Sequence, residues 1–229
     1  MNVCRTGGGG EMRGFTRRVF VLPVSLMLLA GFCQAFQPAG DADEADGFVR
    51  IFDGETFEHW EGDQDVFRIE DGAIVGGTLR RNIPHNFFLR YEDSCSDFEL
   101  RLQFRLIGES TNAGIQVRSR RIPDHHEMVG YQADLGQTYW GCLYDESRRR
   151  RVLAGPDPDK LSKVLKLNDW NEYRIVCRGP RVRLWINDFQ TVDYVERDKD
   201  ISLVGDIALQ IHGGPPGEAW YRNIRMRKL

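Results

Sequence analysis

Three short segments alternate apolar and polar residues and carry groups able to do chemistry on their polar side. In 113–118 (AGIQVR), 131–135 (YQADL) and 207–212 (IALQIH), the polar members are Gln116, Arg118, Gln132, Asp134, Gln210 and His212. Amides and carboxylates can donate to or accept from paired hydroxyls, so such a face suits a neutral polyhydroxylated ligand. The alternative is that these residues only satisfy one another across the sheet or form hydrogen bonds with loops.

The elements that must position these groups are short β-strands. Residues 98–106 alternate strictly between apolar and polar side chains, which is the period-2 pattern of a strand with one buried face. Asp71-Gly72, Gly179-Pro180 and Asn187-Asp188 mark turns between further alternating runs, and 207–211 and 221–226 add strands near the end. We expect an all-β fold, a two-sheet antiparallel sandwich or jelly roll, in one domain.

The composition excludes several classes of protein. The chain has 229 residues, 31 Lys and Arg against 34 Asp and Glu, and a net charge of −3, so nothing favours a nucleic-acid partner. Apolar residues make up 41% of the chain, enough for a folded core. No phosphate-binding glycine loop, Ser-His-Asp order or Cys-His dyad is present, and no nucleotide cofactor is expected.

The N-terminal region has the features of a secretory signal peptide. The apolar run 19–32 follows Arg13, Arg17 and Arg18, and Ala35 suits signal peptidase, so we expect a signal peptide over 1–35. The alternative is an uncleaved anchor, but the run is short for a stable membrane span and contains Pro23. An acidic linker over 36–46 would precede the domain at 47–229, which would be exported to the periplasm or the extracellular space.

Three cysteines would remain after cleavage, namely Cys95, Cys142 and Cys177. An oxidising compartment allows one disulfide and one free thiol, whereas a buried position suits three thiols equally. The spacing leaves both possibilities open.

Several blocks of this sequence resemble one family. They are IFDG from Ile51 with Trp60, NAGIQVRS from Asn112, GYQADLG from Gly130, WGCLYDESRR from Trp140, WNEYRIVCRG from Trp170, LWIND from Leu184, and IALQIHGG with WYRNIRM near the end. Together they resemble the DUF1080 family, also called the 3-keto-disaccharide hydrolase domain, over about 47–229. The resemblance implies a concanavalin A-like jelly roll that cleaves or hydrates 3-keto-glycosides, after a separate sugar 3-oxidoreductase has made the ketone. The commoner family block reads Tyr-Glu-x-Gln, whereas this chain has Tyr131-Gln132-Ala133-Asp134.

The implied chemistry needs a base, an electrophile and an acid. A ketone at C3 acidifies the C2 proton, so a base can start elimination of the C1 oxygen. Asp134 is the expected base or a metal ligand, with a structural pair to Arg118 as the alternative. His212 could polarise the ketone, and Glu127 could be the acid or join His126 at a divalent metal. The spacing does not require a metal.

Further residues are candidates for saccharide binding. The polar candidates are Asn112, Gln116, Arg118, Gln132 and Gln210. Trp140 and Tyr144 are candidate stacking platforms, and one of the two is expected in the core instead. The run 148–151 is four arginines, which we expect in a solvated turn beside Asp145 and Glu146, or bound to an anionic glycan.

Three functions therefore compete. The first is an enzyme acting on 3-keto-glycosides, and the second is a lectin-like carbohydrate-binding module without turnover. Convergence of Asp134, Glu127 and His212 on one sugar carbon would favour the enzyme. The third is a structural or interaction domain of the cell envelope, which a loop covering the Gln116–Asp134–Gln210 face would favour.

Overall fold

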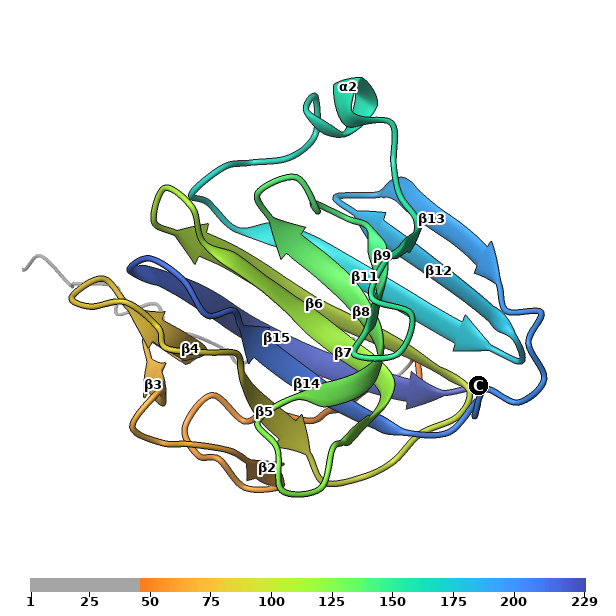
Figure 1. Cartoon of the computed structure of the whole chain (residues 1–229), viewed down its shortest axis with the longest axis horizontal. Helices are drawn as coiled ribbons and strands as arrows, with labels where there is room; N and C mark the ends of the chain where they lie inside the picture. Colours follow the sequence, from red (N-terminus) through yellow and green to blue (C-terminus); the bar gives the residue numbers. More distant parts are fainter. Residues whose placement is uncertain (1–45) are drawn as a thin grey trace, which may run out of the picture. The chain divides into compact units, whose positions relative to one another are not determined.

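The computed structural model describes residues 46–229, which form two stacked antiparallel β-sheets (Figure 1). The expected signal peptide and most of the expected linker lie outside these residues. Among the described residues, no helix is long and apolar enough to span a membrane. The expected all-β sandwich is confirmed.

Sheet A has eight strands in the order β13-β12-β11-β6-β15-β4-β3, with β1 paired to β15. Their bounds are β1 Val49–Arg50, β3 Phe67–Glu70, β4 Ala73–Thr78, β6 Phe98–Ile107, β11 Asn171–Arg178, β12 Arg181–Ile186, β13 Phe189–Val195 and β15 Gly217–Lys228.

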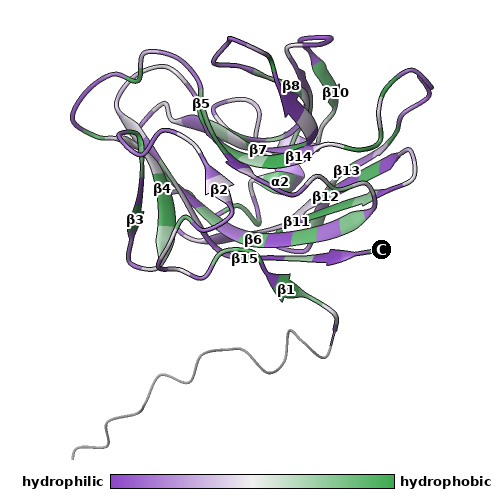
Figure 2. Cartoon of the chain, turned by 90° about the horizontal axis from the view of Figure 1, so that it is seen from below, coloured by the Kyte–Doolittle hydropathy of each residue, from purple (hydrophilic) through white to green (hydrophobic). Residues whose placement is uncertain are grey.

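Sheet B has seven strands in the order β10-β9-β8-β7-β14-β5-β2. Their bounds are β2 Trp60–Glu61, β5 Phe87–Tyr91, β7 Asn112–Arg121, β8 Met128–Gly136, β9 Leu143–Glu146, β10 Val152–Ala154 and β14 Asp206–Ile211. Figure 2 shows β5 on one side and β8 and β10 on the other rising around β7 and β14, so the outer face of sheet B is concave.

The core lies between the two sheets. Leu100, Leu102 and Phe104 enter it from β6, and Ile115 and Leu209 enter it from sheet B. From Leu100 onward, alternate residues of β6 are buried, and the bands of contrasting hydropathy along this strand in Figure 2 follow that alternation. The period-2 pattern in the sequence therefore identified this strand and its buried face.

Tight turns set the strand register as the sequence predicted. Asp71 and Gly72 have φ values of 50° and 69°, and Asn187 and Asp188 have 47° and 65°. Left-handed conformations at both central residues are those of a hairpin turn whose twist matches the flanking strands. These turns join β3 to β4 and β12 to β13.

One short helix was not expected from the sequence. Helix α2, Pro158–Leu161, begins after Asp157, whose side chain accepts hydrogen bonds from the backbone N–H groups of Asp159 and Lys160. Because it is a single turn, it has no helical period to detect. Only the cap and the proline at the first position mark it.

The three described cysteines are free and buried, so the structure has three thiols rather than a disulfide. Burial raises the pKa of Cys142 to about 11 and that of Cys177 to about 12.

Candidate functional site

Four of the expected polar residues meet on the concave outer face of sheet B. Gln116 on β7 lies opposite Gln132 on β8, and Asp134 lies opposite Gly114, which in turn lies opposite Gln210 on β14. All four polar side chains are at most 3% exposed. The shared parity along three adjacent strands brings them together.

A directional chain of hydrogen bonds runs through this group. The Ser119 hydroxyl donates to Gln116 Oε1 at 2.6 Å, and Gln116 Nε2 donates to Gln132 Oε1 at 2.6 Å. Gln132 Nε2 then donates to Asp134 Oδ1 at 3.3 Å. Because every donor points the same way, the bonds polarise one another toward the carboxyl group of Asp134.

Asp134 occupies an environment that favours its protonated form. Burial raises the pKa of Asp134 well above its ordinary value, and this effect outweighs the hydrogen bonds from Gln132 and from the Leu135 backbone N–H. The negative charge of Glu146 raises the pKa further. A carboxyl group of this kind holds a proton at pH values where an exposed aspartate has lost it.

Glu146, which the sequence reasoning did not select as a site residue, is a second carboxyl group of the same face. Tyr144 and Glu146 on β9 lie opposite Gln132 and Gly130 on β8. Burial raises the pKa of Glu146, as does the charge of Glu127, while the Ser147 backbone N–H and His212 lower it. Alternation along residues 143–146 (LYDE) places Glu146 on the same side of β9 as Tyr144. This alternation in the sequence could have identified Glu146 as a site residue.

Glu127 reaches this face from the loop that joins β7 to β8. Its Oε1 accepts a hydrogen bond from Asn86 Nδ2 at 3.0 Å and lies 3.3 Å from His126 Nε2. Asn86 Oδ1 accepts from the Gly213 backbone N–H at 2.9 Å, so the loop is tied to the ends of β5 and β14. The Oε2 atom of Glu127 is buried without a partner among the described residues.

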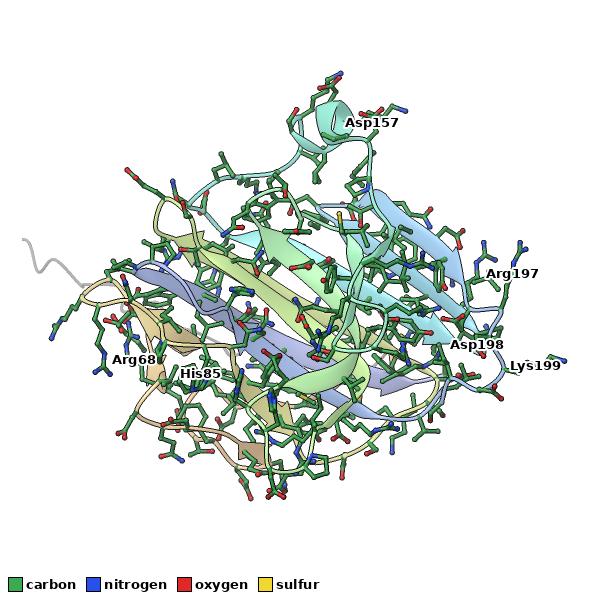
Figure 3. All side chains as sticks on the ribbon, in the orientation of Figure 1. Arg68, His85, Asp157, Arg197, Asp198 and Lys199 are labelled. Atoms are coloured by element: carbon green, nitrogen blue, oxygen red, sulfur yellow. The ribbon has the colours of Figure 1, made fainter. Side chains whose placement is uncertain are left out.

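Three histidine rings line the rim beside Glu127. The ring centroids of His85 and His126 are 4.4 Å apart, and those of His125 and His126 are 4.3 Å apart. In Figure 3, His85 lies on the side of the molecule where β4 and β5 are seen. These rings add titratable groups at the edge of the concave face, which the sequence had indicated only through His126.

Gln210 carries a buried amide that the described residues leave without a hydrogen-bond partner. Its side chain is fully buried, yet neither its Nε2 nor its Oε1 has a hydrogen-bond partner among the described residues. Buried amides are nearly always hydrogen-bonded, so an orphaned one implies a bound ligand or water. The alternative that the polar groups of this face satisfy one another therefore fails at Gln210.

Arg118 corrects the expected arrangement. A bulge shifts the register between Val117 and Arg120, and Arg118 has a φ of 49°. Its guanidinium group donates to the carbonyl oxygens of Ser96 and Gly179 and to Asp97. Because the bulge breaks the alternation, Arg118 does not share the face, and the alternative pairing with Asp134 is wrong.

His212 and Asn112 lie at the end of the face. His212 follows β14, is exposed, and has its Nδ1 2.6 Å from the Gly213 carbonyl oxygen. The Asn112 carbonyl oxygen accepts from the His212 backbone N–H, and both residues line a cavity of about 10 Å³, room for one water molecule.

The two aromatic candidates have different surroundings. Trp140 packs on the core, with its ring centroid 6.2 Å from that of Phe104, so it is the expected core member of the pair. Tyr144 is half-buried on the concave face and meets Tyr139 edge-on at 6.0 Å. Tyr139, which the sequence did not single out, thus adds a second aromatic ring beside Tyr144.

Two of the four arginines in the run 148–151 are engaged within the fold. Arg148 and Arg149 both bind the buried carboxylate of Asp145, and Arg149 also binds Glu196 at 2.6 Å. The expected partnership with Asp145 is confirmed, whereas Glu146 turns to the other face.

The described residues offer no ready metal centre. Among them, no three His, Cys, Asp or Glu side chains are grouped so that they could hold a metal ion. His126 and Glu127 are in contact, but Asp134 and His212 do not complete a ligand set with them.

Comparisons with known proteins agree with the fold. A family model for the 3-keto-alpha-glucoside-1,2-lyase-like domain matches residues 47–227. A candidate glycosyl hydrolase from Parabacteroides distasonis ATCC 8503 superposes with a TM-score of 0.64 at 17% identity, over 82% of this chain and 97% of that one. The search of curated protein sequences gives no match.

Two other solved structures share the jelly roll. The carbohydrate-binding module CBM66 from Bacillus subtilis has a TM-score of 0.56 at 13% identity, over 80% of this chain and 96% of that one. The alginate lyase Aly36B, solved with an alginate tetrasaccharide, has a TM-score of 0.52 at 14% identity, over 80% and 97%. At such identities the likeness shows the fold alone.

Proposed function

Because this chain belongs to the family of the 3-keto-alpha-glucoside-1,2-lyase-like domain, we propose that it is an exported enzyme that cleaves 3-keto-glycosides. Its carbohydrate-related jelly roll supports a saccharide ligand on the concave face. The ketone would come from a separate sugar 3-oxidoreductase, since no nucleotide-binding motif is present in this sequence. Export rests on the apolar run 19–32 and its preceding arginines.

The observation that carries the proposal is the position of two carboxyl groups, Asp134 and Glu146, on the same face of the adjacent strands β8 and β9, where burial raises the pKa of both. Two interacting carboxyl groups seldom ionise together, so one acts as a base while the other retains a proton. Elimination needs that combination. The base takes the C2 proton, the C–H electron pair forms the C1–C2 double bond, and the C1–O bond breaks as its oxygen is protonated.

The surroundings assign the two roles. Glu146 is the less buried group and lies near His212, so it ionises first and is the base. Asp134 is the more deeply buried group, and the charge of Glu146 raises its pKa further, so it keeps its proton and is the acid. This reverses the sequence-based expectation that Asp134 is the base. His212, at the end of the face, would polarise the ketone, and Gln210 would bind a sugar hydroxyl.

Replacement of each carboxyl group tests the assignment. Glu146→Gln and Asp134→Asn should each lower turnover by roughly 10²–10⁴, the usual worth of general acid–base catalysis. Glu146→Gln should also remove the acidic limb of the pH–rate profile, and Asp134→Asn the alkaline limb. Glu172→Gln, an exposed change on sheet A, is the matched control and should leave the profile unchanged. If Glu146→Gln removed the alkaline limb and Asp134→Asn the acidic limb, the roles of the two residues would be reversed. If either variant kept full activity and an unchanged melting temperature, the residue replaced in it would have no part in the mechanism.

The substrate itself is tested with the purified chain, a 3-keto-glucoside and the corresponding unoxidised glucoside, each with and without a chelator. We expect consumption of the keto-sugar only. Consumption of the ordinary glucoside at a similar rate would contradict C2 proton abstraction, because that proton is acidic only beside a ketone.

A lectin-like function is the second candidate. It is supported by the fold that this chain shares with the carbohydrate-binding module CBM66. Binding of both sugars without turnover would establish this function in place of the enzyme.

A further inference from the structure

The outer face of sheet A is an arginine-rich surface that the proposed reaction does not use. By strand register, its outward-facing positions include eleven arginines and five carboxylates. This arginine face comprises Arg50, Arg68, Arg101, Arg105, Arg174, Arg178, Arg181, Arg183, Arg222, Arg225 and Arg227, with Glu70, Glu99, Glu172, Asp193 and Glu218. The surplus of positive charge is notable in a chain whose net charge is −3.

The surplus is arranged in rows across the strands. Arg50, Arg225, Arg101 and Arg174 lie opposite one another on β1, β15, β6 and β11. Neighbouring strands are about 4.8 Å apart, and like charges placed directly opposite destabilise a sheet. Stability alone does not favour such a row, so an anionic partner is the more direct explanation.

One buried carboxylate, Glu99, binds three arginines of this face. Glu99 accepts from Arg101 at 2.7 Å, from Arg174 at 2.6 Å and from Arg227 at 2.6 Å. Its side chain is 2% exposed, whereas those of the three arginines are 33–41% exposed. Glu99 therefore fixes the inner edge of these guanidinium groups while each remains partly open to solvent.

Aromatic rings hold the arginines in place. The guanidinium carbon of Arg174 lies 4.5 Å from the Trp185 ring centroid, and that of Arg105 lies 4.5 Å from Trp220. Arg222 lies over the Trp170 ring at 3.9 Å. Stacking covers one face of a guanidinium group and leaves N–H donors at its edge, so less entropy is lost when an anion binds.

We propose that the arginine face binds an acidic polysaccharide that carries carboxylate or sulfate groups. Arginine binds such groups through two parallel hydrogen bonds, and the register-aligned rows suit a linear polymer with repeated charges. The tryptophan rings are covered by arginines, which leaves little aromatic surface for nucleobases to stack on. The face also differs from the sugar site on sheet B, so the proposal is independent of the proposed reaction.

The test measures binding of the full chain to polygalacturonate, dextran sulfate, neutral dextran, duplex DNA and anionic vesicles over a range of salt concentrations. The variant Arg50→Gln/Arg178→Gln/Arg183→Gln removes three face arginines that do not contact Glu99. The matched control Arg80→Gln/Arg81→Gln/Arg151→Gln removes three exposed arginines elsewhere. Both variants should fold, as a melting curve will show.

We expect both acidic polymers to bind and neutral dextran not to bind. The face variant should bind at least tenfold more weakly, and its slope of log affinity against log salt concentration should be smaller by about two to three. The affinity of the control variant should stay within twofold of the unmodified chain. Equal losses in both variants, no binding to either acidic polymer at low salt, or tighter binding to duplex DNA or anionic vesicles would overturn the proposal. Asp134→Asn should leave polymer binding unchanged, which separates this result from the proposed reaction.

Discussion

The side chain of Gln132 lies across the backbone of Gly114, where a Cβ atom at residue 114 would stand 2.6 Å from the Gln132 Cγ. Gly114 is also the residue opposite Asp134. Strand β7 therefore has no side chain at the point where Gln132 extends toward the carboxyl group of Asp134. A glycine weakens a strand interior, so its presence here indicates a close approach that another residue would block.

Gly114→Ala should therefore disturb the chain of hydrogen bonds that leads through Gln132 to Asp134. The added methyl group must displace Gln132, which should cost about 1–3 kcal/mol of unfolding free energy as overpacking. Turnover should fall as well, because Asp134 loses its donor. Urea unfolding and an activity assay on the same preparation measure both effects.

The double variant Gly114→Ala/Gln132→Ala is the control. If the contact with Gln132 causes the loss, removal of Gln132 relieves it, and the two changes combine non-additively. Strictly additive losses would show that Gly114 matters for another reason.

Local patterns predicted much of this fold. The alternation in 98–106 and the turns at Asp71-Gly72 and Asn187-Asp188 depend on neighbouring residues, so the sequence reveals them directly. The parity of Gln132 and Asp134 placed both on the outer face for the same reason.

The sequence could not predict features that depend on tertiary contacts. Arg118 leaves the face because of a bulge, and no periodic pattern marks a bulge. Glu127 reaches Asn86, 41 residues away in the sequence, only because a loop crosses the sheet. The orphaned amide of Gln210 becomes visible only when all of its neighbours are placed.

Glu99 should make stability depend on acidic pH. Its arginine partners outweigh its burial and lower its pKa from 4.5 to about 2. A depressed carboxyl pKa contributes stability above the unfolded value, and this contribution is lost as the pH falls from 4.5 through 2. Glu99→Gln should lose about 1–3 kcal/mol at pH 7 and show a shallower loss of stability in acid.

Denaturant unfolding at several pH values measures this dependence. Glu70→Gln is the control, because Glu70 likewise binds an arginine, Arg68, but is 47% exposed, and the change should alter stability by less than about 1 kcal/mol. The pKa of Glu196 is also lowered to about 2, so both variants should still lose some stability as the pH falls. An unchanged acid slope in Glu99→Gln would contradict the assignment.

The thiols should be unreactive in the folded chain. Burial raises the pKa of Cys142 to about 11 and that of Cys177 to about 12, so little thiolate exists at pH 8. Iodoacetamide should leave Cys95, Cys142 and Cys177 unmodified until denaturant is added, as peptide mass mapping will show. A disulfide between any two of them in the native protein would contradict the structure.

Gln210 and Gln116 should respond in opposite directions to the same substitution. Gln210→Met replaces a buried, unpartnered amide by an apolar side chain of similar shape, which should raise the unfolding free energy by up to about 1–2 kcal/mol. It should also weaken saccharide binding about tenfold or more, because the amide is then lost to the sugar. Gln116→Met removes an amide bonded to Ser119 and Gln132, and should lower the unfolding free energy by about 1–3 kcal/mol. Melting curves and sugar titrations of both variants decide the matter. If Gln210→Met destabilises the fold as much as Gln116→Met does, the Gln210 amide is satisfied within the protein and does not await a ligand.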